Sequence, residues 1–293
     1  MTTDEPTAAD PSRSAAARPA PVRVRLTVAY DGSAFHGMAA NEGVVTAAGT
    51  LTEALGRVLR HPVTLAVAGR TDKGVHAHGQ VVSFDVADPH VDLAALARAV
   101  NGICGPQISV REPAVVADTF DARFSATWRA YRYTVLNRPD PDPFLARTAW
   151  WVPDALDLNA LRLGCDPLIG PHDFSSFCRR PKGAGPEVTL VRRVLDARWH
   201  DLGDGVLRFD VRANAFCHQM VRSMVGLLVD VGRGRRRAGE VAGIRRALDR
   251  AAVPTVAPPH GLCLWEVGYP DAGGGTEPEE RPRPPGADAG VAR

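Results

Sequence analysis

The segment at residues 63–86 reads VTLAVAGRTDKGVHAHGQVVSFDV and holds two apolar, β-branched runs on either side of a polar loop. Residues 63–68 and 80–86 have the composition of buried strands. The loop between them, at residues 69–79, contains three glycines, two histidines and one aspartate. The segment therefore predicts two neighbouring strands whose connection carries the polar side chains.

The flanking sequence places this strand pair inside a larger unit. Residues 22–30 alternate as VRVRLTVAY, which predicts a strand, and residues 50–60 have helical spacing with Thr50 as a candidate N-cap. Residues 92–103 predict a helix, and residues 108–116 predict a strand. The resulting order, β-α-β-β-α-β, is the split arrangement of ferredoxin-like units.

The second half of the chain has a similar order of elements without a visible sequence repeat. We expect an α+β fold of two ferredoxin-like half-domains, with antiparallel sheets that flank a central active-site cleft. The elements predicted in this half are a strand at 128–136, a helix at 158–168, strands at 189–200 and 206–213, helices at 216–231 and 239–251, and a strand at 262–269.

Composition divides the chain into four parts. The half-domains are expected at residues 22–122 and 123–270, and residues 1–21 and 271–293 are poor in large apolar residues and are expected to be disordered tails. The N-terminus lacks the apolar stretch of a secretory signal, and no apolar run approaches the ~18–20 residues that a membrane helix needs. A cytoplasmic protein with no membrane partner is therefore expected.

The net charge of +2 does not by itself mark a nucleic-acid-binding protein, but the arginines are clustered. Residues 123–138 contain four arginines and no acid, interleaved with aromatic residues, and residues 222–250 contain eight arginines against three acids. Arginine pairs with phosphate through its planar fork, and aromatic rings stack on bases. A GC-rich genome that favours arginine would give the same composition, so RNA binding and compositional bias both stay open here.

The five cysteines give no sign of a disulfide framework or a structural zinc site. Their number is odd, and no pair has C-x-x-C spacing. We expect them to be small buried residues. They are Cys104, Cys165, Cys178, Cys217 and Cys263.

The loop at residues 69–79 holds the first candidate for chemistry, Asp72. Gly74 follows closely and favours a tight backbone that presents the aspartate outward, and Arg70 could point the same way. An aspartate in such a loop is also a common turn residue. His76 and His78 form an H-x-H pair, but no third ligand lies at a sensible spacing, so no metal site is expected.

The segment RANAFCHQMVRSMVG at residues 212–226 predicts a strand that leads into a largely apolar helix. His218 and Arg222 are four apart, which places them on one face of that helix. A buried cation needs an anion nearby, and Asp72 is the candidate partner. The alternative is an arginine at the helix edge that reaches solvent.

A third segment, FDARFSATWRAYRY at residues 120–133, ends in a predicted strand. Tyr131 and Tyr133 alternate along it and therefore share a face. Either ring can pack in the core or stack on a base that has left its helix.

These segments carry a resemblance to a known family. AGRTDKGVHAHGQVVSF resembles the signature loop of the tRNA pseudouridine synthase A family, usually written G-R-T-D-A-G-V-H-A. Other family motifs are similar to RANAFCHQMVRSMVG, FDARFSATWRAYRY, YDGSAFHG, HDFSSF and GLCLWEVGYP, which follow the family's order over residues 22–270.

The resemblance implies a homodimer that isomerises uridine to pseudouridine in the anticodon stem-loop of tRNA without a cofactor. It implies Asp72 as the nucleophile, with Arg70 and Arg222 holding it ionised and oriented. Tyr131 would stack on the uracil and assist removal of the C5 proton. Whether Asp72 attacks C1′ or C6 is left open. The side chains implied to bind substrate are Tyr131, Lys73, His76 and His218.

Two positions depart from the family pattern. Residues 37–39 are Gly-Met-Ala where the family usually has G-W-Q, which leaves the details of tRNA docking open. Lys73 replaces the usual alanine beside Asp72 and adds a possible phosphate contact. A catalytically inactive RNA-binding paralogue of the same fold is the second interpretation, and a metal-dependent hydrolase that uses His76 and His78 is the third.

Overall fold

The computed structural model describes residues 20–180, 183, 185 and 188–270. The tails expected at residues 1–21 and 271–293 lie outside this range, apart from Ala20 and Pro21. Among the described residues, no helix is long and apolar enough to cross a membrane.

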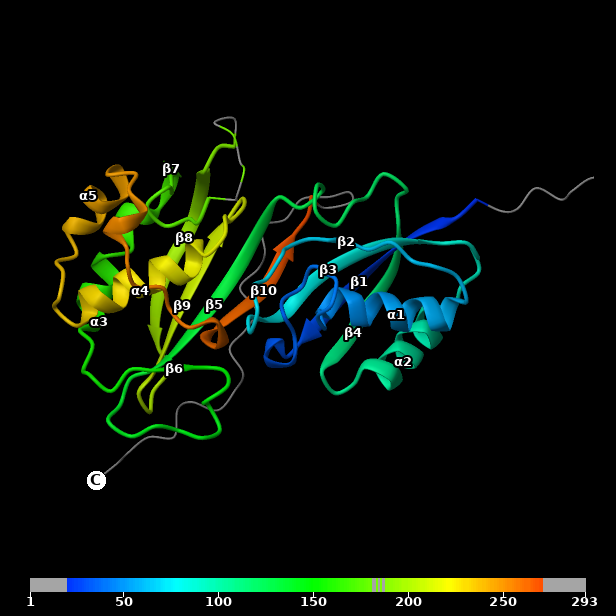
Figure 1. Cartoon of the computed structure of the whole chain (residues 1–293), viewed down its shortest axis with the longest axis horizontal. Coiled ribbons are helices and arrows are strands. Elements are labelled where there is room, and N and C mark those ends of the chain that lie inside the picture. Colours follow the sequence, from blue (N-terminus) through cyan, green and yellow to red (C-terminus); the bar gives the residue numbers. More distant parts are fainter. Residues whose placement is uncertain (1–19, 181–182, 184, 186–187, 271–293) are drawn as a thin grey trace, which may run out of the picture.

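The described chain forms one mixed α+β structure around a large, mostly antiparallel sheet (Figure 1). The strands are β1 (Val22–Tyr30), β2 (Ala66–Val67), β3 (His76–Val86), β4 (Ile108–Val116), β5 (Trp128–Leu136), β6 (Trp150–Trp151), β7 (Gly170–Asp173), β8 (Val191–Asp201), β9 (Val206–Ala213) and β10 (Leu262–Gly268). The helices are α1 (Ala47–Leu59), α2 (Leu93–Cys104), α3 (Leu158–Leu163), α4 (Met220–Gly232) and α5 (Glu240–Arg246). Single 3₁₀ turns are η1 (Gly32–Ala34), η2 (Asp166–Leu168), η3 (Arg250–Ala252) and η4 (Pro259–Gly261).

The sheet runs in the order β4-β1-β3-β10-β5-β9-β8-β7, with β2 paired to β3 and β6 paired to β5. Two separate sheets were expected, but β10 joins the halves into one. Its Cys263 and Leu264 pair in parallel with His76 and Ala77 at the start of β3. This pairing covers strand edges that would otherwise expose unpaired backbone groups. It also brings the residues after Asp72 against the last strand of the chain.

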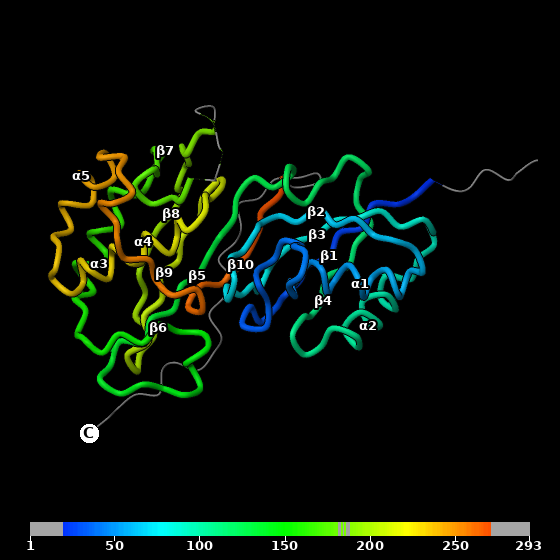
Figure 2. Tube along the Cα trace, viewed as in Figure 1, coloured from blue at the N-terminus to red at the C-terminus, as the bar shows by residue number. Residues whose placement is uncertain are grey.

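Figures 1 and 2 show α1 and α2 at the end of the sheet formed by β4, β1 and β3, and α3, α4 and α5 at the end formed by β9, β8 and β7. Alternate residues of β1, from Val24 to Tyr30, are buried, as the alternating sequence pattern predicts. Helix α4 is buried over nearly its whole length. The middle of the sheet, where β10 and β5 meet, thus lies between two groups of helices.

Several predicted boundaries are wrong at the start of an element. Helix α1 begins at Ala47, because the hydroxyl of Thr46, not Thr50, accepts a hydrogen bond from the Gly49 N–H and caps the helix. The strand predicted at residues 63–68 is only two residues long, and the strand predicted at residues 80–86 begins earlier, at His76. Strand β3 passes very close to β10 at Gly79, where a Cβ would lie 2.3 Å from the carbonyl oxygen of Trp265. Because glycine has no Cβ, β3 can start before this point.

No disulfide framework was expected, but one pair of cysteines forms a disulfide. Cys178 and Cys217 are joined, with their Cα atoms 5.8 Å apart. They are 39 positions apart in sequence and meet only because the segment after β7 lies against the segment before α4. The Arg179 N–H donates to the carbonyl of His218 at 3.0 Å and aligns these two segments. Spacing rules could not detect a pairing made by the tertiary fold.

Candidate functional site

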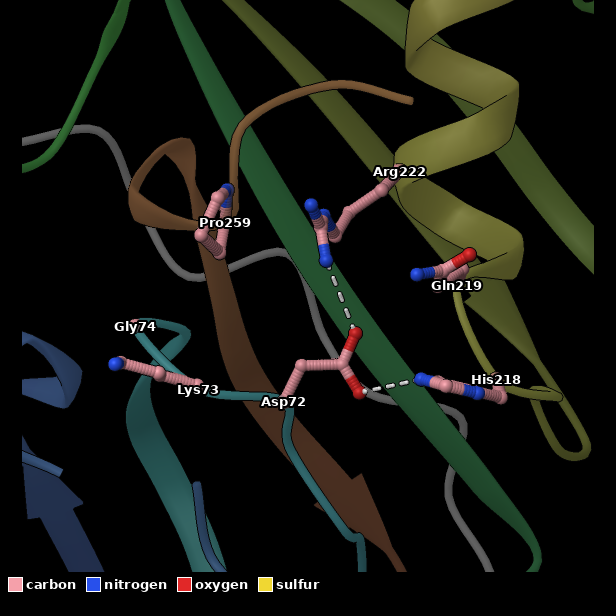
Figure 3. A pocket seen from close by; sticks show the side chains of 7 residues that line it. All are labelled: Asp72, Lys73, Gly74, His218, Gln219, Arg222 and Pro259. Atoms are coloured by element: carbon pink, nitrogen blue, oxygen red, sulfur yellow. Dashed lines mark hydrogen bonds and ion pairs between the residues drawn. The ribbon is translucent and has the colours of Figure 1, made fainter. Parts of the chain in front are cut away.

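A pocket of about 450 Å³ lies where the loop before β3, the start of α4 and the η4 turn meet (Figure 3). We call residues 69–75 the Asp72 loop. The pocket is lined by Asp72, Lys73, Gly74, His218, Gln219, Arg222 and Pro259.

The carboxylate of Asp72 has a nitrogen partner on each oxygen (Figure 3). Nη1 of Arg222 lies 3.2 Å from Oδ2, and Nε2 of His218 lies 3.4 Å from Oδ1. The Arg222 side chain is only 15% exposed, while that of Asp72 is 29% exposed and still faces the pocket. Nε of Arg222 donates to the Ala257 carbonyl at 2.7 Å, which fixes the plane of the guanidinium. Asp72 is therefore the ion-pair partner of Arg222, as the sequence predicted.

His218 reaches Asp72 from a different element than expected. Helix α4 begins at Met220, and Gln219 before it has the left-handed φ of 65°. His218 therefore lies in the turn ahead of the helix, and the prediction that it shares a helix face with Arg222 is wrong. Residues 216–219 contain no glycine or proline that would mark a turn, so the sequence pattern gave no sign of it. His218 and Arg222 nevertheless converge on one carboxylate.

The Asp72 loop is braced by the segment that departs from the family pattern. The Met38 N–H donates to the carbonyl of Thr71 at 3.1 Å, and the Thr71 hydroxyl lies 2.7 Å from that of Tyr30. Gly37 has a φ of +102°, and a Cβ there would lie 2.7 Å from the Thr71 oxygen. The Met38 side chain is fully buried, so the Gly-Met-Ala sequence supports the loop from inside.

Two buried side chains hold the two ends of the same loop. At its start, Gln80 donates to the Gly69 carbonyl at 2.6 Å and accepts from the Gly69 N–H at 3.1 Å. At its end, Nδ1 of His76 accepts from the Gly32 N–H at 3.0 Å, and Nε2 faces the carbonyls of Arg147 and His260. Protein atoms thus engage both ring nitrogens of His76, and its ring is not part of the pocket lining.

The remaining candidates lie outside the Asp72 cluster. Among the described residues, the ion-pair partners of Asp72 are Arg222 and His218, and the exposed Arg70 forms no ion pair with it. Tyr131 is buried and packs edge-on against Phe216 with ring centroids 5.0 Å apart. Burial raises the pKa of Tyr131, and the nearby negative charge of Asp72 acts in the same direction. Tyr131 is therefore a neutral phenol at neutral pH.

Arg129 is a site residue that the sequence reasoning missed. Its guanidinium donates to the carbonyls of Ala68, Asn214, Arg123 and Ala126 at 2.7–3.2 Å. It thereby ties the strand end before the Asp72 loop to the segment before His218. Burial lowers the pKa of Arg129. The available signal was its place two residues before Tyr131, which puts both side chains on one face of β5.

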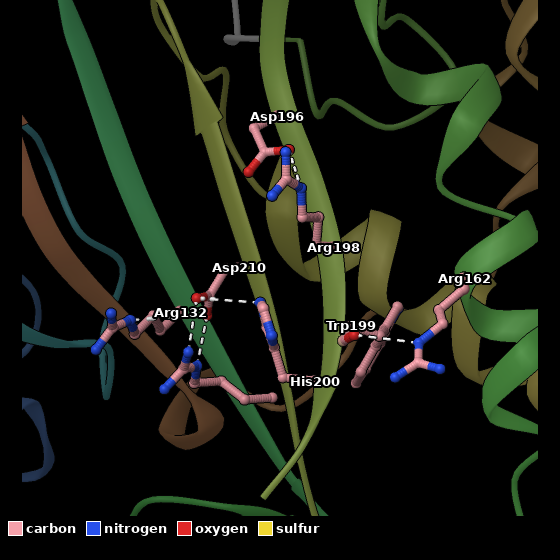
Figure 4. A network of polar contacts seen from close by, with 8 residues as sticks. Arg132, Arg162, Asp196, Arg198, Trp199, His200 and Asp210 are labelled. Carbon is pink, nitrogen blue, oxygen red and sulfur yellow. Dashed lines mark hydrogen bonds and ion pairs between the residues drawn. The ribbon is translucent and has the colours of Figure 1, made fainter. Parts of the chain in front are cut away.

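A second polar cluster lies on β5, β9 and β8 and offers another carboxylate (Figure 4). Asp210 contacts Arg208 at 2.7 Å, His200 at 3.6 Å and Arg132 at 3.7 Å. None of these four residues lines the pocket beside Asp72. Asp210, like Asp72, therefore has cationic neighbours, but it does not line the pocket.

The H-x-H pair does not form a metal site in this structure. His76 is engaged by backbone groups, whereas His78 stacks on Trp265 with ring centroids 4.1 Å apart. Within the described part of the chain, no group of three or more His, Cys, Asp or Glu side chains is placed to hold a metal ion.

Comparison with known proteins gives a consistent result. A family model described as tRNA pseudouridine synthase matches residues 165–270. The protein named tRNA pseudouridine synthase A from Leifsonia xyli subsp. xyli is 41% identical over 268 residues, which cover 85% of this chain and 92% of the relative. The proteins of the same name from Cutibacterium acnes and Frankia casuarinae are 42% and 43% identical over 253 residues each, covering 85% of this chain and 89% and 90% of the relatives.

Proposed function

The chain belongs to the tRNA pseudouridine synthase A family, and we propose that Asp72 is the carboxylate with which it isomerises uridine to pseudouridine in tRNA. The observation that carries this assignment is the Asp72–Arg222 ion pair at the pocket. A guanidinium fixed by a backbone carbonyl neutralises and orients the carboxylate, while 29% of the Asp72 side chain stays open to a reactant.

The chemistry requires one bond to break and another to form on the same nucleotide. The bond from ribose C1′ to N1 breaks and a bond from C1′ to C5 forms, while C5 loses a proton and N1 gains one. No electrons are gained or lost overall. The uridine first leaves its stack, at a cost of a few kcal/mol. Asp72 then acts as a nucleophile at C1′ or C6 while the uracil rotates.

The other side chains have roles that follow from their positions. His218 is the second nitrogen partner of Asp72, and Lys73 on the pocket rim can meet a phosphate. Tyr131 is buried against Phe216, and its raised pKa favours stacking over proton abstraction by a phenolate. Arg70 is exposed, so we assign it to a contact with tRNA. We assign His76 to support of the Asp72 loop, because its ring nitrogens already have protein partners.

Three finer features belong to the same proposal. The targets are uridines of the anticodon stem-loop, the active form is a homodimer, and the compartment is the cytoplasm. We also propose a division into ferredoxin-like halves at residues 22–122 and 123–270. The matching strand orders β4-β1-β3-β2 and β10-β5-β9-β8 support that division.

The test is a tritium-release assay on tRNA labelled at C5 of uridine, because each isomerisation frees one tritium to water. We expect release that is proportional to pseudouridine formed, at positions in the anticodon stem-loop when the product is mapped. Sedimentation at assay concentration is expected to show a dimer. No release from a complete tRNA pool would favour the inactive RNA-binding alternative.

A further inference from the structure

An exposed aromatic ring, that of Phe124, lies in the turn that precedes β5. Phe124 is 79% exposed, so its ring contributes little hydrophobic free energy to folding. The guanidinium of Arg123 lies over its ring, 5.1 Å from the centroid. An aromatic face with a stacked cation is the combination that binds unpaired nucleic-acid bases.

The turn that presents Phe124 is rigidly built. The carboxylate of Asp121 accepts hydrogen bonds from the N–H groups of Arg123 and Phe124, both at 2.8 Å. The Asp121 N–H in turn donates to the Ser125 hydroxyl at 3.0 Å. Ala122 between them is fully buried and donates to the hydroxyl of Ser83 on β3. The ring is therefore held out into solvent by a fixed backbone.

The same turn is tied to both segments that build the Asp72 site. Nη2 of Arg129 donates to the carbonyl of Arg123 at 2.7 Å and to that of Ala68 at 3.1 Å. Nη1 of Arg129 donates to the carbonyl of Asn214 at 3.1 Å. Ala68 leads into the Asp72 loop and Asn214 leads towards His218, so the turn lies where the two sides of the site approach each other.

We propose that Arg123 and Phe124 form a base-stacking platform for an unpaired tRNA base next to the target uridine. This inference rests on the proposed function. A uridine that leaves its stack exposes the face of a neighbouring base, and an aromatic ring restores the lost stacking. Arg123 adds a positive charge that meets the phosphate of the same nucleotide.

The experiment compares Phe124 variants with a matched control at the other end of β5. Phe144, in the loop after β5, is 94% exposed and lines no part of the pocket. Dissociation constants for tRNA and steady-state tritium release are measured for Phe124→Ala, Phe124→Leu, Phe124→Trp and Phe144→Ala. We expect Phe124→Ala and Phe124→Leu to weaken tRNA binding and raise KM roughly 5- to 100-fold, since stacking on one base is lost. Phe124→Trp and Phe144→Ala are expected to match the wild type.

Ionic strength separates the ring from the charge. The slope of log Kd against log salt is expected to stay unchanged in Phe124→Ala and to fall by about one unit in Arg123→Gln. Equal effects of Phe124→Leu and Phe124→Trp, or of Phe124→Ala and Phe144→Ala, would overturn the platform. If the wild type releases tritium and Phe124→Ala equals it, this inference alone fails; if the wild type releases none, the proposed function fails.

Discussion

The Nη1 atom of Arg222 lies 3.2 Å from Oδ2 of Asp72, and Nε of the same guanidinium donates to the Ala257 carbonyl. One arginine thus connects the carboxylate to the backbone that precedes η4. A point charge on a flexible stem cannot make both contacts in this geometry. We therefore propose Arg222 as a positioning residue for Asp72 rather than a ligand of the tRNA backbone.

Arg222→Lys is expected to lower kcat about 10- to 100-fold, which corresponds to roughly 1.4–2.7 kcal/mol of transition-state stabilisation. KM and the salt dependence of tRNA binding are expected to change little, because the contact is internal. The control is Arg235→Lys, whose side chain is 61% exposed and pairs with Asp230. An unchanged kcat together with a weaker affinity for tRNA would identify Arg222 as a phosphate ligand.

Arg129→Gln is expected to lower both the melting temperature and kcat, because several backbone carbonyls lose a charged donor at once. The matched control is Arg132→Gln, which removes an arginine from the same strand beside Asp210. We expect the control to lose some stability but to retain the wild-type kcat at temperatures where it is folded. Equal kcat in both folded variants would mean that Arg129 does not position the site.

The buried tyrosines predict that the free energy of unfolding decreases at alkaline pH. Burial raises the pKa of Tyr30 to about 12 from its ordinary 10.0, and burial raises the pKa values of Tyr131, Tyr133 and Tyr269 as well. The unfolded phenols therefore ionise first as pH increases. The Tyr30 contribution to the free energy of unfolding is complete below pH 10 and is lost between pH 10 and about 12.

Ultraviolet titration checks this expectation. The folded chain should form tyrosinate only well above pH 10, and the chain in denaturant should form it near pH 10. Tyr30→Phe should flatten the decline in unfolding free energy between pH 10 and 12. Tyrosinate that appears near pH 10 while the circular dichroism remains native would contradict the assigned burial.

Affinity for tRNA is expected to fall steeply with salt. A complex with about six phosphate contacts loses on the order of 10³ in affinity between 50 and 200 mM salt. The arginines at residues 123–138 and 222–250 are the expected sources of these contacts, except Arg129 and Arg222, whose guanidinium groups contact internal partners. A nearly flat dependence, measured by filter binding across that range, would mean that the arginines reflect composition alone.

Local patterns predicted the parts of the fold that local physics determines. Residues 22–30, 108–116, 128–136 and 206–213 are strands with the predicted bounds, because alternation and turn residues define them. The β3–β10 pairing was not predictable, since it joins residues far apart in sequence. The same holds for the Cys178–Cys217 disulfide.

The site shows the same division between local and tertiary information. The Asp72–Arg222 pair could be predicted because a cation on an apolar helix requires an anion. The strand pattern could place Arg129 on the same face as Tyr131, but it could not identify the partners of Arg129, because backbone carbonyls have no sequence signature. His76 lies within a family motif, yet only the fold reveals that both of its ring nitrogens already have protein hydrogen-bond partners.

Replacement of Asp72 by asparagine tests the central claim most directly. The measurement is tritium release from C5-labelled tRNA by Asp72→Asn, with tRNA affinity measured in parallel and Asp210→Asn as the control carboxylate outside the pocket. Asparagine preserves the size of the side chain and removes its negative charge and nucleophilicity. The account predicts release below about 1% of the wild-type rate, with near-normal tRNA binding, and a nearly unaffected control. Release by Asp72→Asn at a rate comparable to that of the wild type would contradict the assignment of Asp72 as the nucleophile.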